Sequence, residues 1–332
     1  MSRSGRPVVP ARASVARDAG AAFALDVRYY LSLDQRQLPS RYLYDELGSS
    51  LFEAICRLPW YPITRAETRL LAAHGEDVFK FAGPLTRIVE LGSGSGEKLA
   101  TLVDCRPPSS EPLELHLIDV SAAALAGSMR ALSNLGPQVQ ITAHEAPYEV
   151  GLAEVRTAPH ASGRTLILFL GSNIGNFDPP GAHEFLREIR ATLRAGDCLL
   201  IGADLVKPEA LLQLAYDDPL GVTAAFNRNL LVRINRELDA DFDLQAFEHR
   251  AVWNAAESRV EMHLVSRKRQ VVRVKSAELE ISLADGESIW TESSYKYEPA
   301  VIADLTEQAR FGALAHWIDR DDRFEVALVE AI

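Results

Sequence analysis

Cysteine is scarce in this chain of 332 residues, which contains only Cys56, Cys105 and Cys198. The three cysteines are widely spaced and form no C-x-x-C pair, which argues against a disulfide framework and against a structural zinc site. We therefore expect a protein of a reducing compartment, the cytoplasm, that works without a metal ion.

Basic residues are also few, because 35 Lys and Arg stand against 46 Asp and Glu and give a formal net charge of -11. Nucleic acids and anionic membranes are bound by basic faces. This charge argues against both kinds of partner and favours a small-molecule ligand. We expect the protein to act as a monomer.

Long hydrophobic runs are missing as well. No segment reaches about 18 uninterrupted apolar residues, the length that predicts a membrane-spanning helix. Residues 1–20 are rich in Arg and lack the apolar core of a signal peptide, so we expect a flexible tail there.

Short apolar runs alternate with helical segments in the middle of the chain. The runs are Arg87–Leu91, Leu113–Val120, Thr165–Gly171 and Asp197–Leu205. This alternation predicts an α/β fold with a mainly parallel sheet and crossover helices. Strands this apolar are covered on both faces.

The flanking segments follow a different pattern, with helices, a turn expected at Gly48–Ser50 and a proline-marked break at Leu58–Glu67. We predict that residues 66–206 form a nucleotide-type domain. Residues 21–65 and 207–332 are expected to form a second, α+β domain that holds the substrate in a cleft between the two.

A glycine-rich turn follows the first predicted strand in the stretch Ile88–Lys98, IVELGSGSGEK. Gly92, Gly94 and Gly96 are spaced G-x-G-x-G, unlike the G-x-G-x-x-G of dinucleotide sites, and Glu90 precedes them. Such a turn lets a ligand approach the backbone and the unpaired amides of a helix N-terminus. The acid favours S-adenosylmethionine, which carries an ammonium and a sulfonium group but no phosphate.

Asp119 ends the second predicted strand, where a carboxylate accepts hydrogen bonds from ribose hydroxyls. This position suits both dinucleotides and S-adenosylmethionine, so it does not discriminate between them. From the residues alone, the glycines can also form a tight turn without a ligand, Glu90 can be a solvated acid, and Lys98 can lie on a solvated helix face.

Several separated motifs resemble one enzyme family. They are RYLYDELGSSLFEAICRLP (Arg41–Pro59), ELGSGSGEK (Glu90–Lys98), FLGSNIGNFDP (Phe169–Pro179), the stretch Leu205–Asp243 and TESSYKY (Thr291–Tyr297). From about residue 38 to its C-terminus the chain closely resembles the histidine-specific Nα-methyltransferases of ergothioneine biosynthesis. The resemblance implies a Rossmann-like methyltransferase domain and transfer of methyl groups from S-adenosylmethionine to the α-amino group of L-histidine, as far as the trimethylated betaine.

The resemblance also implies residue roles. Cofactor contacts fall on Gly92, Lys98 and Asp119, and Glu145 stands in HEAPYE, where the family has Gly-Asp-Phe in contact with adenine. The implied substrate contacts are Tyr44, Tyr61, Gly171, Asn176, Tyr216, Met262, Glu292 and Ser294. Of these, Asn176 and Tyr44 are the predicted catalytic residues.

These implied roles are chemically sensible. The amide oxygen of Asn176 can accept a hydrogen bond from the substrate α-amine, and a tyrosine hydroxyl or water can pass on its proton. Tyr44 and Tyr216 can donate to a carboxylate. Glu292 and Ser294 are two residues apart on a strand-like segment, so they share a face that can meet an imidazole. Without the resemblance, these residues read as a turn, core aromatics and a solvated strand.

One departure from the family bears on the substrate. Pro62 stands where the family carries the second of two adjacent tyrosines. It leaves open a methyltransferase of the same fold that acts on another amino acid or on a modified histidine. A non-catalytic binding module is a further alternative, and a nicotinamide dehydrogenase is disfavoured by the glycine spacing.

Overall fold

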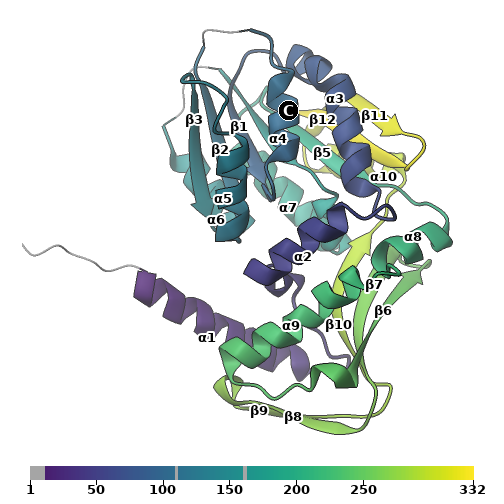
Figure 1. Cartoon of the computed structure of the whole chain (residues 1–332). Coiled ribbons are helices and arrows are strands. Elements are labelled where there is room, and N and C mark those ends of the chain that lie inside the picture. The colour runs from purple at the N-terminus through teal and green to yellow at the C-terminus, as the bar shows by residue number, and fades with distance from the viewer. Residues whose placement is uncertain (1–11, 109–110, 160–162) are drawn as a thin grey trace, which may run out of the picture.

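The computed structural model describes residues 12–108, 111–159 and 163–332, and its centre is a seven-stranded sheet in the order β11-β12-β5-β4-β1-β2-β3 (Figure 1). Its strands are β1 (Leu85–Leu91), β2 (Leu113–Asp119), β3 (Val139–Glu145), β4 (Arg164–Phe169), β5 (Cys198–Asp204), β11 (Phe311–Asp319) and β12 (Phe324–Ala331). The first five strands are parallel, whereas β12 pairs antiparallel with both β5 and β11. The predicted parallel α/β sheet is confirmed.

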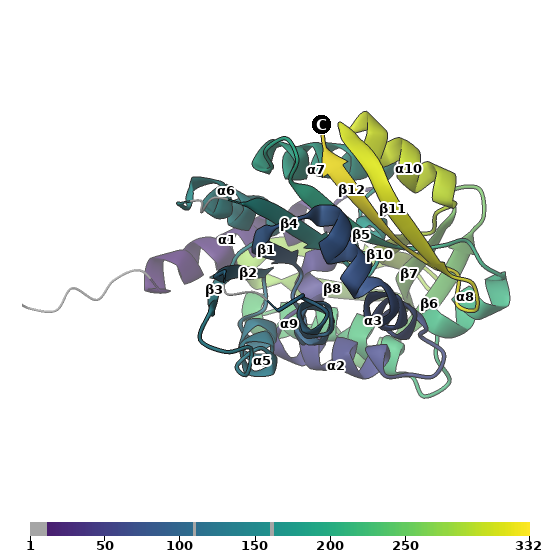
Figure 2. The ribbon, with the colours of Figure 1, turned by 90° about the horizontal axis from the view of Figure 1, so that it is seen from above.

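Helices cover both faces of this sheet, as Figure 2 shows in the view from above. One face carries α3 (Ile63–Ala82), α4 (Glu97–Asp104) and α5 (Ala122–Ala131), and the other carries α6 (Tyr148–Thr157), α7 (Pro179–Thr192) and α10 (Pro299–Gln308). Alternate strand residues face opposite layers, because Leu166 and Leu168 pack in one apolar cluster and Ile167 and Phe169 in the other. The expectation of two covered faces is confirmed.

A second, smaller layer lies beside the carboxyl edge of the large sheet (Figure 1). It comprises a three-stranded antiparallel sheet, β10-β7-β6, a two-stranded sheet, β8-β9, and helices packed against them. The elements are α1 (Arg12–Leu31), α2 (Glu46–Cys56), α8 (Glu209–Tyr216), α9 (Val222–Leu238), β6 (Phe247–Asn254), β7 (Arg259–Ser266), β8 (Gln270–Val274), β9 (Leu279–Leu283) and β10 (Ser288–Tyr295). The two parts share one hydrophobic cluster, which contains Leu71 of α3, Phe226 of α9 and Leu264 of β7.

Strand β10 meets the large sheet at the end of β5. The amide of Tyr297 donates to the carbonyl of Asp204 at 3.0 Å, and the amide of Val206 donates to the carbonyl of Tyr297 at 3.0 Å. The turn η2 (Asn173–Asn176), which follows β4, packs against β10. This junction brings β10 to the edge where an open α/β sheet binds its ligands.

Three boundaries differ from those predicted. Helix α1 begins at Arg12, inside the expected tail, while residues 1–11 lie outside the described residues. Gly48–Ser50 is helical, because the side chain of Asp45 accepts the amide of Gly48 and caps α2. Residues 311–331 extend the large sheet instead of joining the second domain, because β12 is buried along most of its length and pairs with β5.

The part of the chain that the structure describes contains no helix long and apolar enough to cross a membrane.

Gly175 permits the close approach of η2 to β10, since a Cβ atom at this residue would lie 2.7 Å from the carbonyl oxygen of Tyr295. We expect Gly175→Ala to lower the free energy of unfolding by about 1–3 kcal/mol, the usual effect of forcing an extra carbon into a packed site. Urea denaturation measures the change. Gly127→Ala is the control, because its Cβ would meet nothing closer than 3.9 Å. Equal stability of both variants would contradict the prediction.

Candidate active site

The glycine turn connects β1 to α4 at the centre of the large sheet, beside the point where the strand order reverses between β1 and β4. Gly92, Gly94 and Gly96 have φ values of 76°, 50° and 76°, a region that favours glycine. Gly96 is also the N-cap of α4, and a Cβ there would lie 2.7 Å from Cα of Ser128. The turn therefore leaves backbone open to a ligand at the N-terminus of α4.

Asp119 lies at the carboxyl end of β2, next to this turn. Its Oδ2 accepts the amide of Gly94 at 3.2 Å, and its Oδ1 accepts the amide of Ser121 at 2.9 Å. Burial raises the pKa of the Asp119 carboxyl, although the hydrogen bonds from Ser121 and Gly94 oppose this shift. Ser121, Gly94 and Val120 take three of the four lone-pair sites of the carboxylate, so it can also accept a hydroxyl group from a ligand.

Glu90 is buried near the end of β1, with 2% of its surface exposed. Its Oε2 has no hydrogen-bond partner among the described residues. Burial raises the pKa of the Glu90 carboxyl to about 8, against the opposing charge of Lys98. The solvated acid that the sequence alone allowed is therefore excluded. A buried acceptor without a partner fits a ligand that brings a cation or hydroxyl groups.

Lys98 lies on α4 and points to the junction between the glycine turn and β4. Its Nζ pairs with Oε2 of Glu67 at 2.6 Å, and Glu67 is fully buried. Glu67 also accepts the amide of Gly171 at 2.8 Å. Lys98 therefore holds the segment after β4 in place, and the predicted contact between Lys98 and the cofactor stays a prediction.

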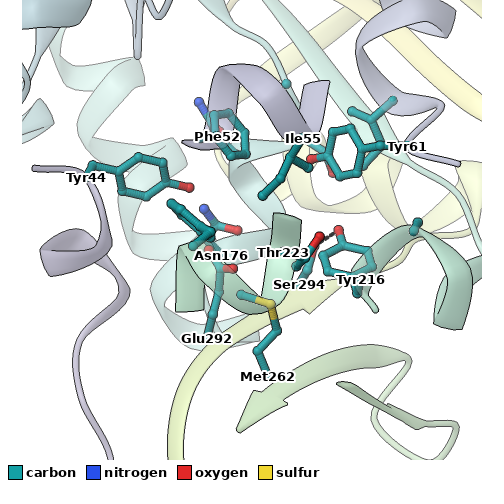
Figure 3. Close-up of a pocket in the computed structure, with 16 residues that line it drawn as sticks. Tyr44, Phe52, Ile55, Tyr61, Asn176, Tyr216, Thr223, Met262, Glu292 and Ser294 are labelled. Carbon is teal, nitrogen blue, oxygen red and sulfur yellow. Dashed lines mark hydrogen bonds between the residues drawn. The ribbon is translucent and has the colours of Figure 1, made fainter. Parts of the chain in front are cut away.

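A cavity lies where the large sheet, α2, α8, α9 and the small antiparallel sheet meet (Figure 3). It is lined by Tyr44, Phe52, Ile55, Tyr61, Ile63, Gly171, Ser172, Asn173, Asn176, Ala215, Tyr216, Thr223, Phe226, Met262, Glu292 and Ser294. All the predicted substrate contacts are in this set, although they come from segments far apart in the chain. The structure brings them together, and their roles stay predictions.

The apolar wall of the cavity was missed by the sequence analysis. Phe52 of α2 and Phe226 of α9 have ring centroids 5.9 Å apart, and Tyr44 meets each of them edge-on at 5.5 Å. Ile55 and Ile63 complete this wall. Nothing in the sequence distinguishes these residues from ordinary core residues.

Glu292 and Ser294 both face the cavity from β10, as their spacing predicts, and Asn176 and Tyr44 point toward the same space (Figure 3). Burial raises the pKa of the Glu292 carboxyl to about 7, and the charge of Lys296 opposes this shift. Met262, on the neighbouring strand, is paired with Glu292 in the β10–β7 ladder. The cavity thus combines one titratable acid with neutral polar groups.

A buried polar cluster adjoins this end of the cavity. The hydroxyl oxygens of Tyr216 and Ser294 lie 2.8 Å apart, and each is 2.8 Å from Nζ of Lys296. Lys296 also pairs with Asp204 at 3.0 Å, and Lys207 pairs with the other oxygen of Asp204 at 2.6 Å. Tyr216 and Ser294 were predicted from the sequence, whereas Lys296, Asp204 and Lys207 were not. The signal for these three was the acid at the end of the apolar strand β5.

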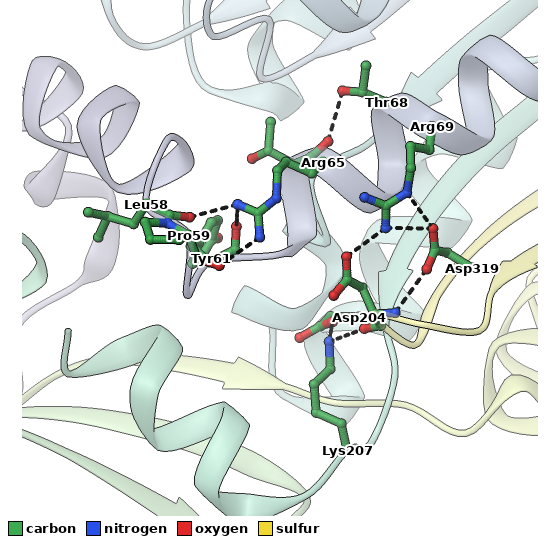
Figure 4. Close-up of polar contacts among 11 residues, drawn as sticks. Leu58, Pro59, Tyr61, Arg65, Thr68, Arg69, Asp204, Lys207 and Asp319 are labelled. Carbon is green, nitrogen blue, oxygen red and sulfur yellow. Dashed lines mark hydrogen bonds and ion pairs between the residues drawn. The ribbon is translucent and has the colours of Figure 1, made fainter.

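The loop that carries Tyr61 is held by Arg65 of α3, which donates to the carbonyls of Leu58 at 2.7 Å, Pro59 at 2.8 Å and Tyr61 at 3.1 Å (Figure 4). Pro62 is the N-cap of α3 and is not among the residues that line the cavity. The departure from the family therefore lies outside the cavity wall, while Tyr61 keeps its place in it.

Glu145, the predicted adenine contact, is exposed at the end of β3 and lies beside Asp119 in the parallel register. Tyr148, at the start of α6, lies closer to the glycine turn, because its hydroxyl would be 2.8 Å from a Cβ at Gly92. Both residues follow the carboxyl end of β3 or lie at it, and the contact at Glu145 stays a prediction.

This arrangement defines a class of protein. The strand order, the glycine turn after β1 and the carboxylate at the end of β2 are those of a Rossmann-like, S-adenosylmethionine-dependent methyltransferase.

Comparison with known proteins gives the particular family. Residues 23–331 match the model of the histidine-specific, S-adenosylmethionine-dependent methyltransferases. The histidine N-alpha-methyltransferase of Mycolicibacterium smegmatis is 43% identical over 314 residues, which are 94% of this chain and 96% of the relative. That of Mycobacterium tuberculosis is 41% identical over 312 residues, again 94% and 96%. The ergothioneine biosynthesis protein 1 of Neurospora crassa is 26% identical over 272 residues, 77% of this chain and 31% of the relative. The chain belongs to the histidine-specific methyltransferase family.

Glu90 generates a prediction about pH. A carboxyl with a higher pKa in the folded than in the unfolded protein stabilises the fold at low pH, and this contribution is lost as the pH rises toward 8. Without ligand, Glu90→Gln should therefore match the wild type in stability near pH 5 and exceed it by a few kcal/mol near pH 9. Urea denaturation at both pH values measures this. Glu145→Gln, which alters an exposed acid, is the control. A difference that does not change with pH would refute the assignment.

Asp119 generates a prediction about the cofactor. Asp119→Asn keeps an oxygen that can accept the amide of Gly94 but removes the charge, so we expect the Kd for S-adenosylmethionine to rise about 10- to 100-fold. Titration calorimetry measures it. Glu114→Gln, at the other end of the same strand, should leave this Kd unchanged. An unchanged Kd in Asp119→Asn would remove Asp119 from the cofactor site.

Proposed function

We propose that this protein transfers methyl groups from S-adenosylmethionine to the α-amino nitrogen of L-histidine, as far as the trimethylated betaine, and so begins ergothioneine biosynthesis. The observation that carries the proposal is the single cavity that contains Tyr216, Asn176, Glu292 and Ser294 beside the glycine turn. The membership of the family and the 43% identity to a histidine N-alpha-methyltransferase support it. We place the enzyme in the cytoplasm as a monomer, as predicted from the sequence.

The residues around the glycine turn fit S-adenosylmethionine. Glu90 offers a buried oxygen that has no hydrogen-bond partner in the described part of the chain, and Asp119 offers a lone pair for a ribose hydroxyl. Gly92, Gly94 and Gly96 leave the backbone open. When bound, the sulfonium of this methyl donor supplies an activated methyl group for an in-line displacement. Lys98 and Glu67 fix the segment of Gly171 between this site and the cavity.

In the cavity, the protein's task is to aim an unprotonated amine. Asn176 follows β4 at the carboxyl edge of the sheet, where its amide oxygen can accept an N–H of the α-amine. Tyr44 points its hydroxyl toward Asn176, so it can take part in removing the amine proton (Figure 3). An α-amine with a pKa of about 8 loses its proton readily, so no strong base is needed. Positioning supplies most of the catalysis.

Glu292 gives the imidazole its recognition in this proposal. Its carboxyl, with a pKa of about 7, can accept an N–H of the ring while Ser294 meets the other side. Anchoring the ring and the carboxylate leaves the amine free to turn between successive methyl transfers. Pro62 is not among the residues that line the cavity, and a methyltransferase of the same fold that acts on another amino acid or on a modified histidine stays the alternative.

Mass spectrometry of products tests the proposal directly. The purified protein is incubated with S-adenosylmethionine and a panel of amino acids, including histidine and ring-methylated histidines. Methylated histidine, with the mass of the trimethylated product at long times, is the expected result. Preferred methylation of another amino acid would overturn the substrate assignment, and no methylation of any amino acid would overturn the activity.

Glu292 also generates a prediction about selectivity. We expect Glu292→Ala to weaken the binding of histidine by about 1–3 kcal/mol, because a hydrogen bond is lost. The variant should also bind apolar rings better, because a buried carboxylate no longer faces them. The kcat/KM ratio of histidine to phenylalanine or tryptophan measures both effects. Ser293→Ala changes the neighbour that is not among the cavity-lining residues and is the control. A ratio that stays at the wild-type value in Glu292→Ala would place imidazole recognition elsewhere.

A further inference from the structure

An amino-acid substrate carries a carboxylate, but the described residues that line the cavity offer it no cation. Among the described residues that line it there is no Lys or Arg. The nearest cation in the polar cluster is Lys296, which lies behind Tyr216 and Ser294 with 0% of its side chain exposed. Its charge therefore acts on the cavity through two hydroxyl groups.

The hydrogen bonds of Lys296 fix the roles of these hydroxyls. An ammonium has three N–H donors and no acceptor. All three are used, toward Tyr216 at 2.8 Å, Ser294 at 2.8 Å and Asp204 at 3.0 Å. Tyr216 and Ser294 must therefore both accept from Lys296. Tyr216 and Asp204 raise the pKa of Lys296 against the effect of burial, so the ammonium stays charged.

The remaining bond, between Tyr216 and Ser294 at 2.8 Å, uses one of the two hydroxyl hydrogens. The pair is thus left with one O–H and one lone pair for the cavity, and these belong to different residues. If Tyr216 donates into the cavity, Ser294 donates to Tyr216 and can only accept from a ligand. The opposite assignment reverses both roles.

We propose that Lys296 is a positioning residue that makes Tyr216 the donor to the substrate carboxylate and Ser294 the acceptor of a ring N–H. Because Glu292 accepts the other ring N–H, the ring is bound in its imidazolium form, which has two N–H donors. The inference rests on the proposed function, because the carboxylate and the imidazole of an amino acid select this assignment. The hydroxyl of Tyr216, which accepts from a cation, becomes a stronger donor to an anion. Two hydroxyl groups that could each donate or accept thus have fixed and opposite roles, and these roles match the carboxylate and the ring of histidine.

The cluster behind Lys296 keeps this array rigid. The side chain of Asp204 lies between two buried lysines. Its backbone amide is also held in place, because it donates to Oγ of Ser172 at 2.9 Å. Lys207 continues the chain of contacts by donating to the carbonyl of Asp322 at 2.6 Å (Figure 4). Lys207 shares Asp204 with Lys296 but forms no hydrogen bond with Tyr216 or Ser294, which makes it a matched control.

The experiment compares histidine with histidinamide, in which the carboxylate is replaced by a neutral amide, by titration calorimetry and by kcat and KM. In Lys296→Met we expect the Kd and KM for histidine to rise about 10- to 100-fold, as for the loss of a charge-assisted contact, with little change for histidinamide. Lys207→Met should lower the stability of the protein but keep the wild-type ratio of the Kd for histidine to the Kd for histidinamide. An unchanged ratio in Lys296→Met, or an equal loss of ratio in Lys207→Met, would overturn the role of Lys296.

A second variant tests the direction of the hydroxyls if Lys296→Met does not fold. Ser294→Ala leaves the ion pair between Lys296 and Asp204 intact. We expect this variant to weaken the binding of histidine but not of 2-pyridylalanine, whose ring nitrogen can only accept a hydrogen bond. Equal weakening of both would show that Ser294 donates, which contradicts the proposal. The wild-type enzyme separates this inference from the proposed function. If it prefers another amino acid, that amino acid and its amide replace histidine in the Lys296 comparison.

Discussion

The buried ion pair between Asp204 and Lys296 joins the two parts of this protein at the point where the active site forms. Asp204 ends β5 of the large sheet, and Lys296 directly follows β10 of the small one. Burying two charges is costly unless they are paired and hydrogen-bonded, so a placement of the strands that separated Lys296 from Asp204 would be destabilised. The backbone bonds between Asp204 and Tyr297 reinforce that placement. Every residue that β10 presents to the cavity depends on it.

Two carboxyl groups, one on either side of the sheet edge, are buried and have raised pKa values. Glu90 and Glu292 are both withdrawn from water, which raises their pKa values to about 8 and about 7. Each is close to a fixed lysine, Lys98 or Lys296, that opposes the shift without neutralising it by a direct bond. Groups of this kind interact strongly with ligands that bring a positive charge or an N–H, because little water competes. In the proposed function, Glu90 meets the cationic methyl donor in this way and Glu292 meets the imidazole.

Local sequence patterns predict much of this architecture, whereas the remainder depends on contacts between segments that are distant in the chain. The strands of the parallel sheet are apolar runs, and the glycine turn is recognisable from its spacing. The helix cap at Asp45 is also a local pattern, so the helix at Gly48–Ser50 could have been predicted from the sequence. Lys296, by contrast, stands in a segment that reads as a solvated strand, and only its meeting with β5 buries it. The return of β12 to the large sheet has the same origin, since strand pairing across the whole chain leaves no local signal.

The hydrophobic cluster shared by both parts couples the stability of each part to that of the other. Leu71, Phe226 and Leu264 belong to one continuous core, so neither part can open without exposing apolar surface of the other. A ligand that binds only the folded chain adds its binding free energy to the stability of the whole. If histidine binds in the cavity and S-adenosylmethionine at the glycine turn, as proposed, then occupancy of either one protects the other against local opening. Cellular supply of either molecule then bears on how long the enzyme survives proteolysis, because proteases act on the opened chain.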